Sequence, residues 1–172
     1  MISNIFSHIF KKHDALLVVK NHKTGEIKII PGKNIVTTAG NTYYAECSCG
    51  QTPTNAFINL YLATAGPDPC TVTDDYSDFT LHAGGEKAIS SGYPKCPCTD
   101  GDNTGKGATV VTWKYEYTTG DGPFVDITHS FIAQVNASGT DPILNAYKWA
   151  SSWSKDAATT AIIYTNHTML GS

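Results

Sequence analysis

The stretch ATVVTWKYEYTTGDGPFVDITHSFIAQV, residues 108–135, decides the fold class of this chain. Its first part, 108–118, alternates large apolar side chains with polar ones, a period of two that indicates a β-strand. Its last part, 125–135, mostly repeats that alternation. Between them stands Thr-Gly-Asp-Gly-Pro, residues 119–123, a typical turn sequence. The stretch therefore predicts two antiparallel strands joined as a hairpin.

The rest of the chain continues this pattern, because β-branched and aromatic residues are abundant and Gly and Pro interrupt them at short intervals. Residues 57–64 alternate cleanly, and we expect the face of Ile58 and Leu60 to point inward and the other face to be exposed. The remaining predicted strands cover residues 15–20, 26–30, 79–81, 87–89, 144–149 and 159–168. The prediction is an all-β fold, an antiparallel β-sandwich or jelly roll, in which the strands at 15–20 and 26–30 form a hairpin.

One short helix is expected after residues 34–40. Thr38 or Asn41 would cap it, and Gly40 would cost it stability. A length of 172 residues suits one domain. Regular periodicity is lost among the Gly and Pro residues of 65–107. We therefore expect an N-terminal docking arm at 1–14, followed by a single β-sandwich domain at 15–172 with a long loop excursion at 65–107.

The N-terminal arm has its own pattern, in which apolar residues recur at helical spacing ahead of two lysines. These apolar residues are Ile2, Ile5, Phe6, Ile9 and Phe10. A secretory signal would place its charges before a continuous apolar run, so the order found here disfavours one. The pattern predicts an amphipathic helix that docks on a protein partner, on the domain itself or on a membrane surface, and packing against protein is the favoured interpretation.

The charges and the lengths of the apolar stretches argue against two classes of partner. The net charge is −3, and all twelve basic residues are lysines, so no guanidinium is present for bidentate contacts to phosphate or guanine. We therefore expect no binding to nucleic acid. No stretch reaches the roughly 20 apolar residues that cross a bilayer, and we expect no membrane partner.

The cysteines form the most distinctive local pattern. Cys47 and Cys49 make one Cys-x-Cys pair, Cys96 and Cys98 make another, and Cys70 lies between them. Two disulfides could join the pairs and fix the long excursion to the helix, or four thiolates could bind zinc. Structural zinc motifs usually have two or more residues between paired cysteines, so disulfides are favoured over zinc and over reduced thiols.

Motifs for catalysis are not evident. His82, His129 and His167 are far apart in sequence, and none belongs to a known nucleophile or metalloprotease motif. Residues 100–105, Asp-Gly-Asp-Asn-Thr-Gly, match the first half of a calcium loop, but Val111 occupies the position of its final acid. The sequence therefore predicts a protein that is not an enzyme and has no cofactor. A hydrolase with paired carboxylates stays as an alternative.

Several short motifs resemble tailed-bacteriophage virion structural proteins. A hairpin with Lys-Thr-Gly-Glu at 23–26 precedes Asn-Ile-Val-Thr-Thr-Ala-Gly at 34–40, which leads into a helix. A strand passing into a Gly/Pro/Thr loop at 58–69, a tyrosine-rich strand with Trp113 and a final Thr-rich strand after Lys155 are also similar. The cysteine pairs and the excursion depart from that pattern. The resemblance implies a β-sandwich located in the virion.

The resemblance also implies a function. The expected role is a capsid decoration or tail-associated protein that binds the major capsid or tail protein and forms a homo-oligomer. The alternative from a binding class is a tail-fibre or carbohydrate-binding adhesion module, which would present a cluster of exposed Tyr and Trp side chains.

Overall fold

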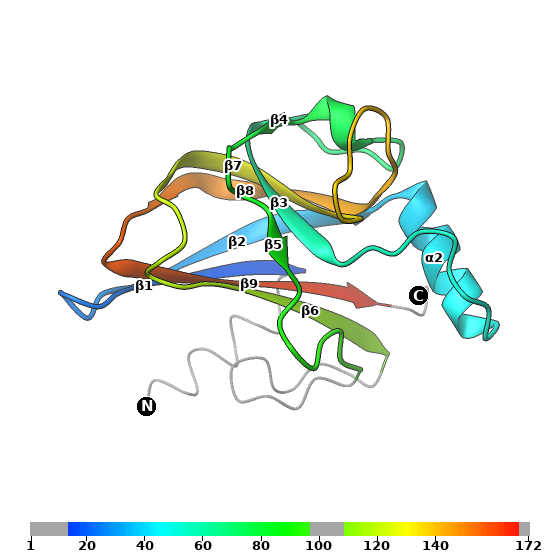
Figure 1. Ribbon diagram of the computed structural model, residues 1–172, viewed down its shortest axis with the longest axis horizontal. Helices are drawn as coiled ribbons and strands as arrows, with labels where there is room; N and C mark the ends of the chain where they lie inside the picture. Colours follow the sequence, from blue (N-terminus) through cyan, green and yellow to red (C-terminus); the bar gives the residue numbers. More distant parts are fainter. Residues whose placement is uncertain (1–13, 97–108, 169–172) are drawn as a thin grey trace.

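The computed structural model describes residues 14–96 and 109–168, and these residues form a curled antiparallel sheet with one α-helix at its side (Figure 1). The elements are β1 (Ala15–Asn21), β2 (Ile27–Val36), α2 (Thr38–Ser48), β3 (Asn59–Ala65), the 3-10 turn η1 (Tyr76–Asp78), β4 (Thr80–Leu81), β5 (Lys87–Ala88), β6 (Val110–Tyr117), β7 (Phe124–Ala133), β8 (Ile143–Lys155) and β9 (Thr159–Thr168).

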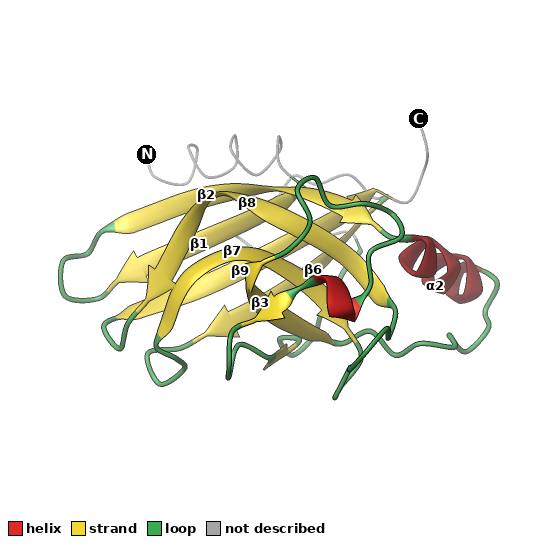
Figure 2. Cartoon of the chain, turned by 90° about the horizontal axis from the view of Figure 1, so that it is seen from above, coloured by secondary structure: helices red, strands yellow, loops and turns green. Residues whose placement is uncertain are grey.

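The strands follow the order β4-β3-β7-β8-β2-β1-β9-β6, and β5 pairs with β3. Every pairing is antiparallel. The sheet curls so that its two halves face one another around a common core (Figure 2). The predicted all-β, sandwich-like class with one short helix is therefore confirmed, as is the hairpin of β1 and β2, in which Leu17 pairs with Ile30.

The predicted hairpin of residues 108–118 and 125–135 is wrong, although both strands exist. β6 pairs with β9, and β7 pairs with β3 and β8. In Figure 1 the loop after β6 leads to β7 on the opposite half of the curled sheet. Tyr117 and Phe124, at the two ends of this loop, contact each other across the core, with ring centroids 5.2 Å apart. The turn residues therefore connect the two halves of the sheet instead of neighbouring strands.

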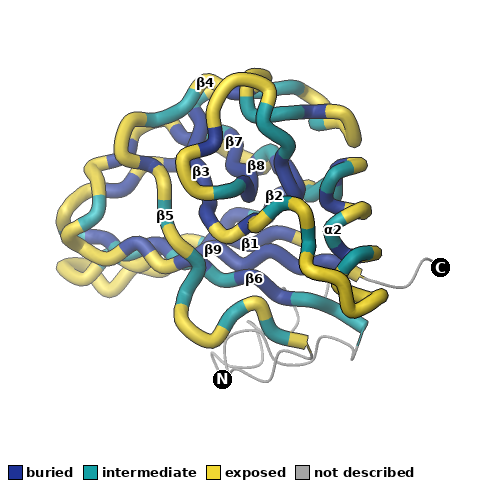
Figure 3. Tube along the Cα trace, turned by 45° about the vertical axis from the view of Figure 1, so that its right-hand side comes forward, coloured by how far each residue is buried: buried dark blue, intermediate teal, exposed yellow. Residues whose placement is uncertain are grey.

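The main core lies inside the curl and is rich in aromatic side chains. Trp113, Tyr115 and Tyr117 of β6 are buried against Tyr147 and Trp149 of β8 and against the inward side chains of β1 and β9. Figure 3 shows the buried residues following the strands, while exposed residues gather in the connecting loops. Aromatic rings bury large apolar areas, so they account for much of the stability of a domain of this size.

A second core covers the other face of β3 and β7. Tyr61 and Phe131 stack with ring centroids 5.4 Å apart, and Phe79 packs on Phe131 from the loop before β4. Residues 57–64 were expected to be exposed on this face, but β3 is buried on both faces. Leu60 points into the main core as predicted, whereas Ile58, before the strand begins, is 41% exposed.

Helix α2 begins earlier than the sequence suggests. Thr37 is its N-cap, and its side chain accepts a hydrogen bond of 3.0 Å from the backbone N–H of Gly40. Thr38 and Asn41, the predicted caps, lie within the helix. Gly40 has a structural reason for its place, because a Cβ there would lie 2.0 Å from the carbonyl oxygen of Leu144. The helix therefore packs backbone to backbone against β8 at this position.

We predict that Gly40→Ala lowers the free energy of unfolding by about 1–3 kcal/mol, because the added methyl group overlaps a backbone atom that cannot move aside. Asn41→Ala, at the next and exposed helical position, is the matched control and should change it by less than about 0.5 kcal/mol. Urea denaturation followed by tryptophan fluorescence measures both. Equal stability of Gly40→Ala and the parent protein would contradict the close approach.

Candidate docking surface

The outer face of strands β2, β1 and β9 carries apolar side chains, although the core lies on their inner face. Leu16, Val18, Ile29, Ile162 and Tyr164 form this cluster, which we call the outer cluster. The cross-strand register places Leu16 beside Tyr164, and Val18 between Ile29 and Ile162. Because side chains alternate along a strand, the neighbouring inward residues belong to the main core. These three strands are therefore apolar on both faces.

The outer cluster continues toward β6 as a polar patch. The hydroxyl of Thr112 donates a hydrogen bond of 2.7 Å to the side-chain oxygen of Asn166, and both residues are buried. The ammonium group of Lys114 lies 5.8 Å from the ring centroid of Tyr164 and forms an ion pair of 2.9 Å with Glu116. The outer face thus changes from apolar to charged across the sheet.

A groove of about 690 Å³ opens on the β2 and β8 side of the same region. Pro31, Lys33, Ile35, Cys70, Lys148 and Ala150 are among its lining residues. Asp68 also lines the groove and pairs with Lys148, and this ammonium group lowers the pKa of the Asp68 carboxyl. Asp14, the first described residue, lies at the groove as well. The groove offers apolar walls together with both signs of charge.

The free edge of β6 is largely covered. The backbone N–H groups of Ser90 and Lys95 donate to the carbonyl oxygens of Lys114 and Thr112, each at 2.9 Å, and the N–H of Thr112 donates to Lys95 at 2.8 Å. The opposite edge strand, β4, has only two residues. Short and covered edges limit the addition of a strand from another chain. The accessible surfaces for binding are therefore faces and loops.

Six of the predicted site residues lie outside the part of the chain that the structure describes. The arm residues Ile2, Ile5, Phe6, Ile9 and Phe10, and Cys98, lie outside the described residues.

Cys47 and Cys49 are at the C-terminal end of α2, exposed and free, and Cys96 is exposed next to the undescribed stretch 97–108. Cys70 is a free thiol at the groove, where burial raises its pKa to about 11. In the described part of the chain no group of three or more His, Cys, Asp or Glu side chains could hold a metal ion. Because Cys98 is not described, the disulfide and zinc hypotheses for the two pairs stay predictions.

Two of the histidines fasten loops to strands. His129 shares hydrogen bonds with the hydroxyl of Thr128 at 2.8 Å and with the carbonyl oxygen of Pro67 at 3.1 Å, and burial lowers its pKa. His82 accepts a hydrogen bond of 3.3 Å from the backbone N–H of Val125. These contacts hold the loop after β3 and the loop after β4 against β7, which is a structural use of both rings.

His167 belongs to a buried polar network beside α2. The indole N–H of Trp113 donates to the hydroxyl of Tyr44 at 2.8 Å, and that hydroxyl in turn contacts Nδ1 of His167. If Tyr44 donates this bond, Nε2 of His167 carries the proton, and Nε2 has no hydrogen-bond partner. Burial lowers the pKa of His167 to about 3. The ring is therefore neutral at physiological pH and joins α2 to the sheet.

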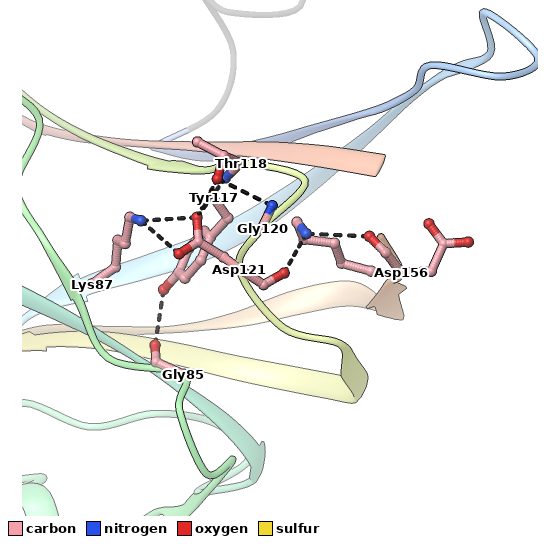
Figure 4. Close-up of polar contacts among 8 residues, drawn as sticks. Gly85, Lys87, Tyr117, Thr118, Gly120, Asp121 and Asp156 are labelled. Atoms are coloured by element: carbon pink, nitrogen blue, oxygen red, sulfur yellow. Dashed lines mark hydrogen bonds and ion pairs between the residues drawn. The ribbon is translucent and has the colours of Figure 1, made fainter. Parts of the chain in front are cut away.

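A second polar network closes the opposite end of the sheet (Figure 4). The carboxylate of Asp121 forms an ion pair of 2.9 Å with Lys87 and accepts a hydrogen bond of 2.6 Å from the N–H of Thr118. Lys155, which is 2% exposed, donates to the carbonyl oxygens of Asp121 and Asp156, and burial lowers its pKa. The network fixes the loop between β6 and β7 to β5 and β8.

The sequence contained a signal for the outer cluster. The run from Ala15 to Val19 is continuously apolar, as expected for a strand buried on both faces. The groove had no such signal, because its lining comes from segments that are distant in sequence. No described helix has the length and apolar character needed to span a membrane. Comparisons with protein-family models, curated proteins and solved structures find no match.

We predict that Cys47 and Cys49 are alkylated in the native, unreduced protein, because both thiols are exposed and free. Cys70 should react at least about tenfold more slowly near pH 8, since its raised pKa leaves little thiolate. Peptide mass spectrometry after timed iodoacetamide treatment measures all three rates. Labelling of Cys47 and Cys49 only after reduction would instead support the disulfides predicted from the sequence, and stoichiometric zinc would support the metal site.

We predict a loss of stability in acid that depends on His167. The unfolded chain takes up a proton near the ordinary histidine pKa of about 6.5, whereas the folded protein does so only near pH 3, so the stabilising contribution falls as pH drops through this window. His167→Gln should reduce the slope of unfolding free energy against pH by up to about 1.4 kcal/mol per pH unit. His22→Gln, at an exposed position, is the control. Identical slopes in all three proteins would exclude a buried neutral His167.

Proposed function

We propose that this chain is a structural protein of a tailed-bacteriophage particle, which attaches to the major capsid or tail protein and to its own copies through protein–protein contacts. The observation that carries the proposal is the groove beside β2 and β8, which combines apolar walls with charges of both signs. Contiguous apolar surface with a polar border is typical of protein-binding sites. The phage assignment itself rests on the sequence motifs that resemble virion proteins.

The groove is the proposed contact with the particle. Its apolar walls include Pro31 and Ile35, and Lys33 and the Asp68–Lys148 pair supply charges at the same place. Such a lining suits a partner segment that presents both apolar and charged side chains. The covered edge of β6 and the short β4 support face-to-face contacts over strand addition.

The positions of the aromatic residues favour this role over carbohydrate binding. A sugar-binding module would expose tryptophan and tyrosine rings around a groove. Here all three tryptophans, Trp113, Trp149 and Trp153, are buried, as are Tyr115 and Tyr147. Their rings therefore serve the core and are not available to stack on a sugar.

We predict that mass spectrometry of gradient-purified particles of the phage that encodes this chain finds it at a fixed stoichiometry to the major capsid or tail protein. Repeated symmetric contacts require many copies, so its ratio to that protein should stay constant through successive purification steps. A soluble host protein, followed in the same fractions, should decline instead. Absence of the chain, or a trace amount that declines with the host protein, would refute the proposal.

Variants in the groove refine the same experiment. Ala150→Lys places a charge in the groove and should reduce incorporation into particles severalfold, whereas Ser152→Lys adds the same charge at an exposed position on β8 outside it. Normal folding of both variants is checked by circular dichroism. Equal incorporation of the two variants would remove the groove from the interface.

A further inference from the structure

We propose that the N-terminal arm, residues 2–10, packs on the outer cluster of its own chain. The sequence predicted that the arm docks on a protein surface, and the structure supplies one beside the point where the arm joins the domain. This inference concerns the free protein and does not depend on the proposed role in a particle.

Two members of the outer cluster are buried in a single chain. Leu16 is 0% exposed and Tyr164 is 1% exposed, although both point away from the main core. Their described apolar neighbours, Val18, Ile29 and Ile162, belong to the same sheet face. Side chains on one face of a sheet stand side by side, roughly perpendicular to it, so these neighbours enclose Leu16 laterally. Another part of the same chain must cover it from above.

The described segments near this face lie at its two sides. Residues 90–95 pair with the edge strand β6, and residues 68–70 line the groove beside β2 and β8. Leu16 is on β1, which lies between β2 and β9 in the sheet. The cover over the centre of this face therefore comes from a stretch outside the described residues.

Composition selects the arm among those stretches. Residues 97–108 contain no large apolar side chain, and residues 169–172 contain two, Met169 and Leu170. The arm contains five, at positions that share one side of a helix with the pattern i, i+3, i+4, i+7 and i+8. These are Ile2, Ile5, Phe6, Ile9 and Phe10. Among the undescribed stretches, only the arm has an apolar stripe long enough to cover an apolar sheet face.

The connection between the arm and β1 also allows this packing. Asp14 immediately follows the arm, and its carbonyl oxygen accepts a hydrogen bond of 2.7 Å from the N–H of Asn166, which holds the start of β1 to β9. A helix over residues 2–13 would be about 18 Å long at about 1.5 Å per residue. Four adjacent strands, spaced about 4.8 Å apart, measure about 14 Å between the outer two. The helix can therefore cross from β1 over its neighbours without an intervening linker.

Direct connection favours the chain's own arm over the arm of a second copy. A short tether gives the arm a millimolar effective concentration at the face, which exceeds the concentration of other chains in dilute solution. The arm of the free protein is therefore committed to its own sheet, and contacts with a partner would use the groove and loops.

Photo-crosslinking tests this placement in the full-length purified protein. Benzoylphenylalanine in place of Phe6 should form intramolecular crosslinks to tryptic or chymotryptic peptides that contain Val18 or Ile162, and the product should migrate as a monomer. The same amino acid in place of Asn4, on the opposite side of the predicted helix, is the matched control and should give at least about fivefold less of that product. Equal yields from the two positions, or products that are only intermolecular at micromolar protein, would overturn the proposal.

Thermal unfolding gives a second, independent measurement. Phe6→Asp should lower the unfolding temperature by about 2–6 °C, because it removes an apolar side chain from a packed face, whereas Asn4→Asp should leave it within about 1 °C. An unchanged unfolding temperature for Phe6→Asp would contradict packing on the domain. Neither measurement involves particles, so failure of this proposal and failure of the proposed particle function are distinguishable.

Discussion

The pairing of β9 with both β1 and β6 is the constraint on which the rest of the structure depends. β9 is the last strand, yet it lies between the first strand and one from the middle of the chain, through seven paired positions with β1 and eight with β6. This arrangement draws the sheet into a curl and buries Trp113, Tyr115 and Ile163 within it. Closing such long loops costs chain entropy, which burial of the aromatic core offsets. Both ends of the described chain therefore meet on one part of the sheet.

This constraint explains what the sequence could predict of the fold. The period of two located the strands, since it follows from the alternation of side chains and is local. The choice of strand partner is not local. The segment Thr-Gly-Asp-Gly-Pro after β6 is compatible with a hairpin, but Tyr117 and Phe124 each bury a ring in the core, and only a connection across the curl satisfies both. The prediction of a hairpin failed because core packing outweighed turn preference.

Contacts between residues distant in sequence also decide where helix α2 begins. Gly40 looked like a weakness within the helix, because glycine loses much conformational freedom on folding. The reason for its presence lies more than a hundred residues away, where the carbonyl of Leu144 approaches its Cα. The N-cap is Thr37 and not a predicted residue for a related reason. The backbone N–H of Thr37 donates a hydrogen bond to the same carbonyl oxygen, which holds Thr37 against β8. Local rules found the helix, and contacts with β8 set its beginning.

The candidate surface was predictable only in part, and the reason is again the difference between local and distant contacts. The continuous apolar run at the start of β1 was visible in the sequence, and so was the stripe of the arm, but our proposal that the two pack together rests on the burial of Leu16 and Tyr164. A buried Lys155 and a buried His167 fasten opposite ends of the sheet through hydrogen bonds that sequence patterns do not reveal. Buried polar groups of this kind must keep their partners, because losing one leaves an uncompensated donor or charge. The ends of the sheet are thereby fixed and its edges are short or covered, so the faces and loops are left as the surfaces through which this protein can bind others.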